Sequence, residues 1–512
     1  MLLQPLKPVL TTKAAREAAI IRSQKEIFAM SDTSTNQSTL SPQLPLDVVV
    51  MAAGKGTRMK SRLPKVLQRL AGKPLLGHVL DTASLLHARS AVVITGHGAD
   101  EVEAAVVKRN TGLPVKFVRQ EPQLGTGHAV QQAVPELADD GLVVVLSGDV
   151  PLTQADTLMA LMACVQGATG QSDRLALLTL EMADPTGYGR IVRTADGLKV
   201  QAIVEQKDAS PEQLKIKEVY SGIMAVPAKQ LKVWLAKLDN HNAQGEYYLT
   251  DVVKWAVADG VSVVAHRIQD EVQVTGVNSP QQLAQLERAY QLQKANELML
   301  QGVRLADPAR LDLRGNLTCG TDVEIDVNCI FEGTVRLGDG VRIGPNCLIA
   351  NADIAAGAVV HAFTHIDGEK AGVTVGEGAL VGPFARLRPG AQLGPDVHIG
   401  NFVEVKNSTL AKGAKANHLA YLGDATVGER VNYGAGSITA NYDGANKHRT
   451  LIEDDVHIGS NCVLVAPVTI GAGGTVGGGS TISKNTQPGA LSVARGRQIS
   501  IANWQRPQKK ST

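Results

Sequence analysis

The most constraining feature of this chain is a period of six residues between Val375 and Ile482. Apolar residues recur at every sixth position in two series, Val375, Val381, Leu387, Leu393, Ile399 and Val405, then Ile452, Ile458, Leu464, Ile470, Val476 and Ile482. This period fits neither an α-helix nor a simple hairpin, but it is typical of a hexapeptide β-helix, in which short strands form the sides of a triangular prism. We expect the apolar residue of each hexad to point into the prism. Glycine often follows it directly and is expected to serve a corner, where a positive φ is often needed.

The bulk composition suits thin, repetitive β-structure and excludes several classes of protein. Of 512 residues, 51 are glycine and only 3% are aromatic. With 51 basic and 49 acidic residues the formal net charge is +2, so we expect neither nucleic acid nor a membrane as partner. No apolar run reaches about 18 residues, the length of a membrane span. The five cysteines are dispersed without a CxxC pair, which predicts free thiols in a reducing compartment, the cytoplasm.

The chain divides into segments of different pattern. Residues 1–45 carry no continuous apolar core of a secretory signal and end in a polar stretch, so we expect a disordered extension; Met30 offers an alternative start. Residues 46–277 alternate apolar strands with helix-like segments, which predicts a mostly parallel, Rossmann-like α/β domain. The expected strands are Leu46–Met51, Ala91–Thr95, Leu142–Ser147, Leu175–Leu180 and Val261–Ala265.

A helix is expected to join this domain to the hexads. Ser279 is a suitable N-cap followed by Pro280, and Gly302 a suitable stop, which predicts a linker helix within residues 278–302. The β-helix is expected over residues 303–495, with a basic tail over 496–512.

Two motifs of the α/β domain indicate phosphate chemistry. The first strand is followed by Met51-Ala52-Ala53-Gly54-Lys55-Gly56-Thr57-Arg58-Met59, where small residues allow the backbone to approach a phosphate and N–H groups to bind it. This loop is neither a Walker A loop nor a dinucleotide fingerprint, and its glycines alone are equally compatible with a tight structural turn. Asp149, in Ser147-Gly148-Asp149-Val150-Pro151, ends another strand where α/β sheets place ligands, although a lone Asp also caps helices.

With Leu63-Pro64-Lys65, the loop resembles the sugar-nucleotidyltransferase (nucleotide-sugar pyrophosphorylase) family. Further matching segments are Gln120, Leu124–Ala129, Ser147–Pro151, Pro185–Ile191, Val204–Asp208 and Gly276–Asn278. With the hexads attached, the chain from about residue 46 onward is similar to the bacterial family that joins a uridyltransferase to an acetyltransferase with a left-handed parallel β-helix.

That resemblance implies two reactions. The C-terminal domain would transfer an acetyl group from acetyl-CoA to glucosamine-1-phosphate. The N-terminal domain would then join N-acetylglucosamine-1-phosphate to UTP, releasing pyrophosphate and UDP-N-acetylglucosamine for peptidoglycan and lipopolysaccharide. A homotrimer with acetyl-CoA between adjacent prisms is also implied.

For the N-terminal domain, the resemblance implies that Asp149 and Asn278 hold Mg²⁺ and that Arg58 and Lys65 clamp the triphosphate and the sugar phosphate. Solvated surface charge is the alternative reading of these two cations. Positions implied to bind UTP are Met51, Ala52, Ala53, Gly54, Gln120, Gly125, Thr126, Ser147 and Gly148. Gly189 and Glu205 would face the sugar. Tyr220 stands where the family usually has an Asn that helps bind the sugar, and a phenol lacks the amide.

For the C-terminal domain, acetyl transfer to an amine needs a base with a pKa near 7, which favours histidine. The chain has 12 histidines, and read without its neighbours a histidine on a β-helix is more often a surface residue. The resemblance implies that His418 is the base and that Glu404 orients it. It also implies that Arg388 and Lys406 bind phosphate.

Other implied contacts complete this second site. Tyr421 and Asn432 would position the sugar. Acetyl-CoA would meet Ala435, Asn441, Tyr442, Ser460, Gly478 and Arg495, and the Asn441-Tyr442 loop interrupts the hexads, as functional loops of solenoids do. Trp504 and Lys509-Lys510 either fold over this site or belong to a disordered tail.

Two other functions compete with this reading. One is a pyrophosphorylase whose β-helix serves only assembly; His418, Glu404 and the Asn441-Tyr442 loop argue against it. The other is a nucleotide-sensing scaffold without catalysis, which would lack Asp149, Lys65 or Asn278, yet all three are present.

Overall fold

The computed structural model describes residues 45–110, 112–166 and 173–507. Residues 1–44 of the extension expected over residues 1–45, and Lys509-Lys510 of the tail, lie outside the described residues. No helix in these described ranges is long and apolar enough to cross a membrane.

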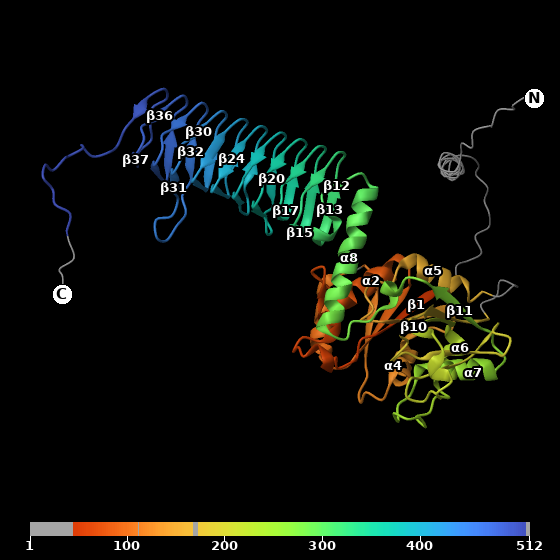
Figure 1. Ribbon diagram of the computed structural model, residues 1–512. Helices are drawn as coiled ribbons and strands as arrows, with labels where there is room; N and C mark the ends of the chain where they lie inside the picture. The colour runs from red at the N-terminus through yellow and green to blue at the C-terminus, as the bar shows by residue number, and fades with distance from the viewer. Residues whose placement is uncertain (1–44, 111, 167–172, 508–512) are drawn as a thin grey trace, which may run out of the picture. The chain divides into compact units, whose positions relative to one another are not determined.

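The N-terminal part is built on one sheet with β1 (Leu46–Met51) near its centre and the strand order β11-β7-β10-β6-β1-β4-β5 (Figure 1). The other strands of this path are β4 (Ser90–Thr95), β5 (Val115–Arg119), β6 (Leu142–Ser147), β7 (Leu175–Glu181), β10 (Glu218–Pro227) and β11 (Val263–Ile268). β10 runs antiparallel to β6 and β7, whereas the other pairs of the path are parallel. A hairpin of β8 (Arg190–Arg193) and β9 (Val200–Val204) pairs with β10 through β8. The mostly parallel sheet is confirmed, and each predicted strand has a counterpart, although the last one runs over Val263–Ile268 and not over Val261–Ala265. The strands β5 and β10 were not predicted.

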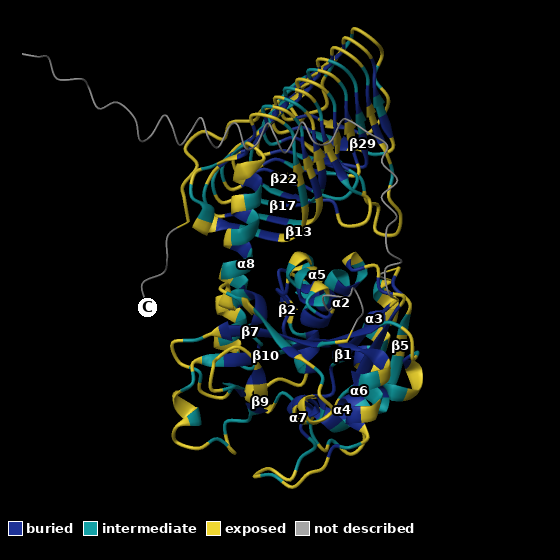
Figure 2. Cartoon of the chain, turned by 90° about the vertical axis from the view of Figure 1, so that its right-hand side faces the viewer, coloured by how far each residue is buried: buried dark blue, intermediate teal, exposed yellow. Residues whose placement is uncertain are grey.

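Both faces of this sheet are covered by helices, so its central strands are apolar on both sides. Val48 and Val50 of β1 pack into one cluster and Val49 into another, and all three are fully buried. The helices of the first cluster are α2 (Leu75–Leu85), α3 (Ala99–Arg109) and α5 (Ala155–Ala163), and those of the second are α4 (Thr126–Ala133), α6 (Ala228–Leu235) and α7 (Val252–Ala258). Figure 2 shows the strands buried between them. Because helices cover both faces, the loops at the carboxyl ends of β1 and β6 are the expected place for a ligand.

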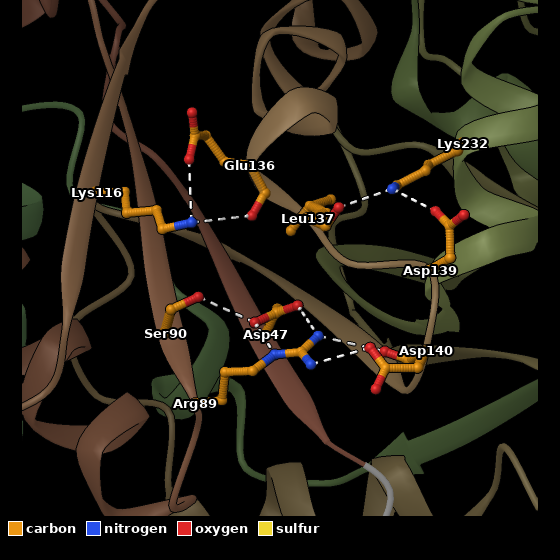
Figure 3. A network of polar contacts seen from close by, with 9 residues as sticks. All are labelled: Asp47, Arg89, Ser90, Lys116, Glu136, Leu137, Asp139, Asp140 and Lys232. Atoms are coloured by element: carbon orange, nitrogen blue, oxygen red, sulfur yellow. Dashed lines mark hydrogen bonds and ion pairs between the residues drawn. The ribbon is translucent and has the colours of Figure 1, made fainter.

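A buried carboxylate fixes the opposite, amino end of β1 (Figure 3). Asp47 accepts hydrogen bonds from Nε (2.9 Å) and Nη2 (2.6 Å) of Arg89 and from Oγ of Ser90 (2.9 Å). Burial by itself raises the pKa of Asp47, but the bonds from Arg89 and Ser90 outweigh it and hold this pKa below its usual range. The network therefore stabilises the end of the sheet opposite to the edge at which a ligand is expected.

The helix predicted after Ser279 is α8 (Pro280–Leu300), and the Ser279 side chain accepts a hydrogen bond from the Gln282 backbone N–H as its N-cap (3.3 Å). Gln291 of α8 is buried and makes two bonds to Leu313: its Nε2 donates to the carbonyl (2.9 Å) and its Oε1 accepts from the N–H (2.7 Å). The side-chain amide therefore makes with β13 (Leu311–Cys319) the two backbone hydrogen bonds that a neighbouring strand would otherwise make.

The hexads form a β-helix in which every strand pair is parallel. One face is an 11-stranded sheet, and a 16-stranded sheet forms two faces joined through β17 (Leu348–Ile354). In this second sheet β13 and β15 (Cys329–Leu337) continue from β17.

The strands of each face are as follows. The first face holds β12 (Arg304–Leu305), β14 (Glu324–Ile325), β16 (Arg342–Ile343), β18 (Val359–Val360), β21 (Leu380–Val381), β24 (His398–Asn401), β27 (Lys415–His418), β30 (Asn432–Tyr433), β33 (His457–Ile458), β36 (Thr475–Val476) and β38 (Leu491–Ser492). The second holds β20 (Val373–Val375), β23 (Gln392–Leu393), β26 (Thr409–Leu410), β29 (Ala425–Val427), β32 (Thr450–Ile452) and β35 (Val468–Ile470). The third holds β19 (His365–Asp367), β22 (Arg386–Leu387), β25 (Glu404–Lys406), β28 (Tyr421–Gly423), β31 (Ile438–Ala440), β34 (Val463–Val465) and β37 (Thr481–Ile482).

The apolar hexad positions point into the prism as predicted. All twelve residues of the two series are at most 5% exposed. Val375 pairs with Leu393, Val381 with Ile399, and Leu387 with Val405, so one coil consists of three hexads. Each period of six residues therefore corresponds to one face of the prism.

The glycines after the hexad residues serve a different purpose from the predicted one. Among Gly376, Gly382, Gly394, Gly400, Gly459 and Gly471, only Gly382 has a positive φ. A Cβ on Gly400 would instead collide with the backbone of Asn417 in the next coil. Glycine is needed there because successive coils approach closely, while positive φ values fall on other corner residues such as Asn346 (60°) and Phe384 (56°).

Candidate active sites

A cavity of about 540 Å³ lies at the carboxyl ends of β1 and β6. Among the residues predicted from the sequence, it is lined by Met51, Ala52, Ala53, Gly54, Lys65, Gln120, Gly125, Thr126, Ser147 and Asp149. These residues come from four separate segments that the parallel sheet brings to a single edge. The cavity is therefore the place where the first motif and the Asp149 motif meet.

The loops around this cavity are held by backbone contacts that need small residues. Gly148 donates its N–H to the carbonyl of Met51 (2.9 Å). Gly125 has a φ of 113°, and a Cβ there would collide with the backbone of Tyr247. Gln120 is 4% exposed and donates from Nε2 to the Gly125 carbonyl (2.8 Å). The glycines are thus used both for conformation and for close approach.

Three side chains of this edge converge on one point. Oδ1 of Asp149 accepts a hydrogen bond from Oγ of Ser147 (2.6 Å), and its Oδ2 pairs with Nζ of Lys65 (2.5 Å). The same Nζ donates to Oδ1 of Asn278 (3.2 Å). One carboxylate oxygen and one amide oxygen therefore face a common cation, and such oxygen donors suit Mg²⁺, which keeps most of its waters.

Four other predicted residues do not line this cavity, namely Arg58, Gly189, Glu205 and Tyr220. Arg58 lies in the short helix η1 (Thr57–Met59), is exposed and is not among the lining residues. Gly189, Glu205 and Tyr220 form a second group: Tyr220 donates its N–H to the Gly189 carbonyl (2.9 Å), and a Cβ on Gly189 would lie 3.7 Å from the Glu205 carboxylate oxygens.

This second group is buried and incompletely hydrogen bonded. The Tyr220 hydroxyl is buried without a partner among the described atoms. Glu205 accepts a hydrogen bond from Oγ1 of Thr250 (3.0 Å) and lines a separate cavity of about 700 Å³ with Asp208 and Asp251. Burial raises the pKa of Glu205.

Sequence reasoning missed several lining residues, namely Lys55, Gly56, Thr57, Val66, Gln123, Ala129 and Glu246. Gln123 donates its Nε2 to the Ala53 carbonyl, so it fixes the phosphate-loop backbone. Gln123 lies directly before the Leu124–Ala129 motif, and this position could have identified it as a lining residue. Glu246 belongs to a loop without any phosphate-binding pattern, and nothing in the sequence pointed to it.

In the β-helix, the imidazole of His418 contacts an amide rather than the expected carboxylate. Nδ1 of His418 lies 2.7 Å from Oδ1 of Asn401. An amide oxygen only accepts, so this contact favours the tautomer of the neutral imidazole that has its proton on Nδ1 and its lone pair on Nε2. His418 is exposed, at the end of β27, and is therefore accessible to a substrate.

Glu404, which was predicted to orient His418, contacts other side chains in this structure. Glu404 accepts from Nη1 of Arg388 (2.8 Å) and of Arg386 (3.4 Å), with no bond to His418 among the described contacts. The reason is register: Asn401 pairs with His418, whereas Glu404 pairs with Tyr421 on the next face. The side chain that contacts His418 is therefore Asn401, at the equivalent position one coil back, and not the Glu404 carboxylate.

Cations gather on the face that carries Tyr421. Arg388 is the largest influence that lowers the pKa of Lys406, followed by desolvation and by Lys447. Sequence analysis named Arg388 and Lys406 but missed Lys447, which stands in the loop between β31 and β32. Three neighbouring cations stand against one carboxylate, Glu404, so this surface carries a local excess of positive charge.

The loop that interrupts the hexads is a hairpin of residues 441–448 that projects from the prism (Figure 1). Tyr442 and Lys447 form an antiparallel bridge, and Asn441 donates Nδ2 to Oδ2 of Asp424 at its base (2.5 Å). The Tyr442 side chain is 61% exposed. The hairpin therefore presents Tyr442 and Lys447 from a base fixed to the prism.

Three of the predicted acetyl-CoA residues, Ala435, Ser460 and Gly478, form one row with His418 along an edge of the prism. The carbonyls of Asn401, His418, Ala435 and Ser460 accept N–H groups of Leu419, Gly436, Asn461 and Gly479 in turn. Gly478 continues the row, and Nη1 of Arg495 donates to its carbonyl (2.8 Å). Asn432 lies on the same face, between Lys415 and His457 in register. Trp504 is 64% exposed.

Comparison with known proteins places both halves of the chain. A family model described as a MobA-like NTP transferase domain matches residues 48–188, and one described as bacterial transferase hexapeptide (six repeats) matches residues 372–407 and 449–484.

Relatives named bifunctional protein GlmU match nearly the whole length. That of Albidiferax ferrireducens is 73% identical over 471 residues, which covers 91% of this chain and 100% of the relative. Those of Paracidovorax citrulli and Polaromonas naphthalenivorans are 74% and 75% identical, and each match covers 91% of this chain and 98% of the relative. With both domains matched in the same order, the chain belongs to the family of the bifunctional protein GlmU.

Proposed function

We propose that this enzyme makes UDP-N-acetylglucosamine by two successive transfers at two separate sites. The C-terminal site acetylates glucosamine-1-phosphate with acetyl-CoA, and the N-terminal site joins the product to UTP with release of pyrophosphate. The observation that carries the proposal is that a chain of this family holds both a phosphate-loop cavity and an oriented histidine beside a cation cluster.

At the C-terminal site, the hydrogen bond between His418 and Asn401 leaves Nε2 free to take a proton from the attacking amine. The nitrogen forms its bond to the acetyl carbon, the C–S bond breaks, and the proton passes from Nε2 to the departing CoA sulfur. Arg388, Lys406 and Lys447 would bind the phosphate of the sugar, and Tyr421 and Asn432 its ring. The row of Ala435, Ser460, Gly478 and Arg495, with the 441–448 hairpin, would bind acetyl-CoA.

At the N-terminal site, Asp149 and Asn278 would hold Mg²⁺, which supplies positive charge against the repulsion between the nucleotide and the sugar phosphate. Lys65 would contact the same phosphates, and the small residues from Met51 to Gly54 would present N–H groups to them. A phosphate oxygen of the sugar attacks the α-phosphorus, and pyrophosphate leaves. Glu205, Gly189 and Tyr220 would bind the sugar, whereas Arg58 would reach the triphosphate from the exposed helix η1.

We propose a homotrimer in the cytoplasm. All five cysteines are free, which supports a reducing compartment. Assembly is supported by an exposed apolar row on the β-helix, formed by Phe363, Phe384, Phe402 and Leu419. The rings of Phe363 and Phe384 stack at 4.9 Å, and those of Phe384 and Phe402 at 5.3 Å.

The test is a coupled assay of the full chain with glucosamine-1-phosphate, acetyl-CoA, UTP and Mg²⁺, following free CoA and pyrophosphate together. We expect both products, with pyrophosphate dependent on prior acetylation. Asp149→Ala should abolish pyrophosphate release and leave CoA release intact. His418→Ala should abolish CoA release, and it should still release pyrophosphate when N-acetylglucosamine-1-phosphate is supplied directly. Loss of both activities in either folded variant would contradict two separate sites.

A further inference from the structure

The ammonium group of Lys65 lies where the proposed Mg²⁺ ligands converge. It pairs with Oδ2 of Asp149 at 2.5 Å and donates to Oδ1 of Asn278 at 3.2 Å. Both partners are the residues assigned above to the metal. The side chains of Lys65 and Asp149 are only 14% and 13% exposed, so this pair is screened less by solvent than a surface pair.

The stem of the Lys65 side chain packs against the loop that carries Gly56. Gly56 has a φ of 60°, and a Cβ there would collide with Cβ of Lys65, so the phosphate loop packs against the stem. The four-carbon stem of lysine lets the ammonium swing without moving the backbone. Lys65 also lines the cavity, so a phosphate bound there would offer its ammonium group an alternative partner.

We propose that Lys65 is a built-in competitor for the divalent cation. Its ammonium occupies the Asp149 and Asn278 oxygens before nucleotide binds, and it must leave when the metal enters. This inference rests on the proposed function, because it uses the same metal ligands. When UTP brings phosphates into the cavity, Lys65 gains a new partner and releases the oxygens, so metal and nucleotide bind cooperatively.

The experiment measures Mn²⁺ binding by electron paramagnetic resonance on the full chain, first without nucleotide. Lys65→Met keeps a similar stem and removes the charge, and we expect it to lower the Mn²⁺ Kd about tenfold, equivalent to roughly 1.4 kcal/mol. The matched control is Lys55→Met, a loss of the same charge in the same cavity. Lys55 forms no ion pair among the described residues, and its substitution should change the Kd less than about twofold.

Two outcomes would overturn the proposal. One is an unchanged or higher Kd in folded Lys65→Met, with Lys65→Gln as a second variant. The other is an equal gain in Lys55→Met, because the effect would then be general electrostatics. Saturating UTP supplies a second readout: it should tighten Mn²⁺ binding in the wild type by a larger factor than in Lys65→Met.

The failure of this inference is distinguishable from failure of the proposed function. Asp149→Asn in the Lys65→Met background should remove the gained Mn²⁺ affinity. If wild type and Lys65→Met bind Mn²⁺ equally but Asp149→Asn weakens both, the metal site stands and the competition is wrong. If Asp149→Asn changes nothing even with UTP present, the proposed metal site itself is wrong, and the inference falls with it.

Discussion

At the scale of single residues, the sequence predicted candidate catalytic and binding side chains, but it did not predict which side chains contact one another. His418 was identifiable because its neighbours form a motif, but its partner depends on the register between coils. Asn401 precedes His418 by 17 residues, and no local pattern marks it. Lys447 was missed for a similar reason, since it reaches the cation cluster only through the folding of the 441–448 hairpin.

The Asn401 contact predicts a selective loss of acetyl transfer. Asn401→Ala removes the acceptor that fixes the His418 tautomer, so we expect acetyltransferase kcat to fall about 100-fold, within the range of general-base effects. Asn401→Asp keeps an acceptor oxygen and should retain most of the rate. Uridylyl transfer in the same protein is the internal control. If Glu404→Gln lowers the acetyltransferase kcat by the same factor without changing the KM for glucosamine-1-phosphate, the Glu404 carboxylate, and not Asn401, would be the group that orients His418.

The unpartnered hydroxyl of Tyr220 predicts a change in sugar affinity without a loss of stability. It is buried without a hydrogen-bond partner among the described atoms, so Tyr220→Phe leaves no protein group unsatisfied. If this hydroxyl bonds to the sugar as proposed, its removal costs about 1 kcal/mol, a roughly fivefold rise in KM for N-acetylglucosamine-1-phosphate. The KM for UTP should stay constant. Steady-state kinetics with an unchanged sugar KM would remove Tyr220 from the sugar site.

At the scale of elements, periodicity and capping predicted the architecture because both depend on local or regularly repeated requirements of the chain. Each hexad residue must enter the prism, so its apolar character recurs every six residues. Ser279 caps α8 through a bond within its own first turn. The role of Gly400 was not predictable in the same way, because it depends on the distance to Asn417 in another coil.

The packing of α2 on α8 predicts a stability that falls in mild acid. His78 is buried, its Nε2 lies 2.9 Å from the Leu70 carbonyl, and its ring meets Tyr290 edge to face at 5.6 Å. Burial is the largest cause that lowers the pKa of His78 to about 4. Because the unfolded chain takes up this proton near pH 6.5 and the folded chain does not, stability falls as pH drops from 6.5 toward 4.

At pH 5 this linkage amounts to a loss of about 2 kcal/mol relative to pH 7. Urea unfolding at both pH values, compared between the wild type and His78→Gln, measures it. The variant retains a donor for the Leu70 carbonyl but does not titrate, so its stability should depend less on pH. Parallel pH dependences of the two proteins would show that His78 is not the titrating group.

At the scale of the whole molecule, motif order along the chain was enough to predict two domains with two chemistries. A parallel sheet collects the ends of distant strands at one edge, so motifs at strand ends become one cavity. A β-helix stacks residues one coil apart into rows, so scattered positions such as Ala435 and Ser460 become neighbours of His418. The contacts that the outer surface of the prism makes with other molecules could not be predicted in this way. They depend on the exposed side chains, which follow no repeating pattern.

The exposed row of Phe363, Phe384, Phe402 and Leu419 carries the last prediction. The three aromatic residues have φ values of 59°, 56° and 57°, a region that bulky side chains seldom adopt, and they are 50%, 46% and 55% exposed. Strain combined with an exposed apolar row indicates a surface that becomes buried in the assembly. A charge placed in this row should therefore oppose self-association.

We expect the double variant Phe384→Asp, Phe402→Asp to shift the protein from trimer to monomer in sedimentation velocity. Acetyl transfer should fall with it, because the proposed acetyl-CoA site lies between prisms, while uridylyl transfer stays near its wild-type rate. Leu198→Asp is a matched control, since Leu198 is 78% exposed in the nucleotidyltransferase half. If the double variant remains a trimer, another face of the prism must make the contact, and the strained aromatic row needs a different partner.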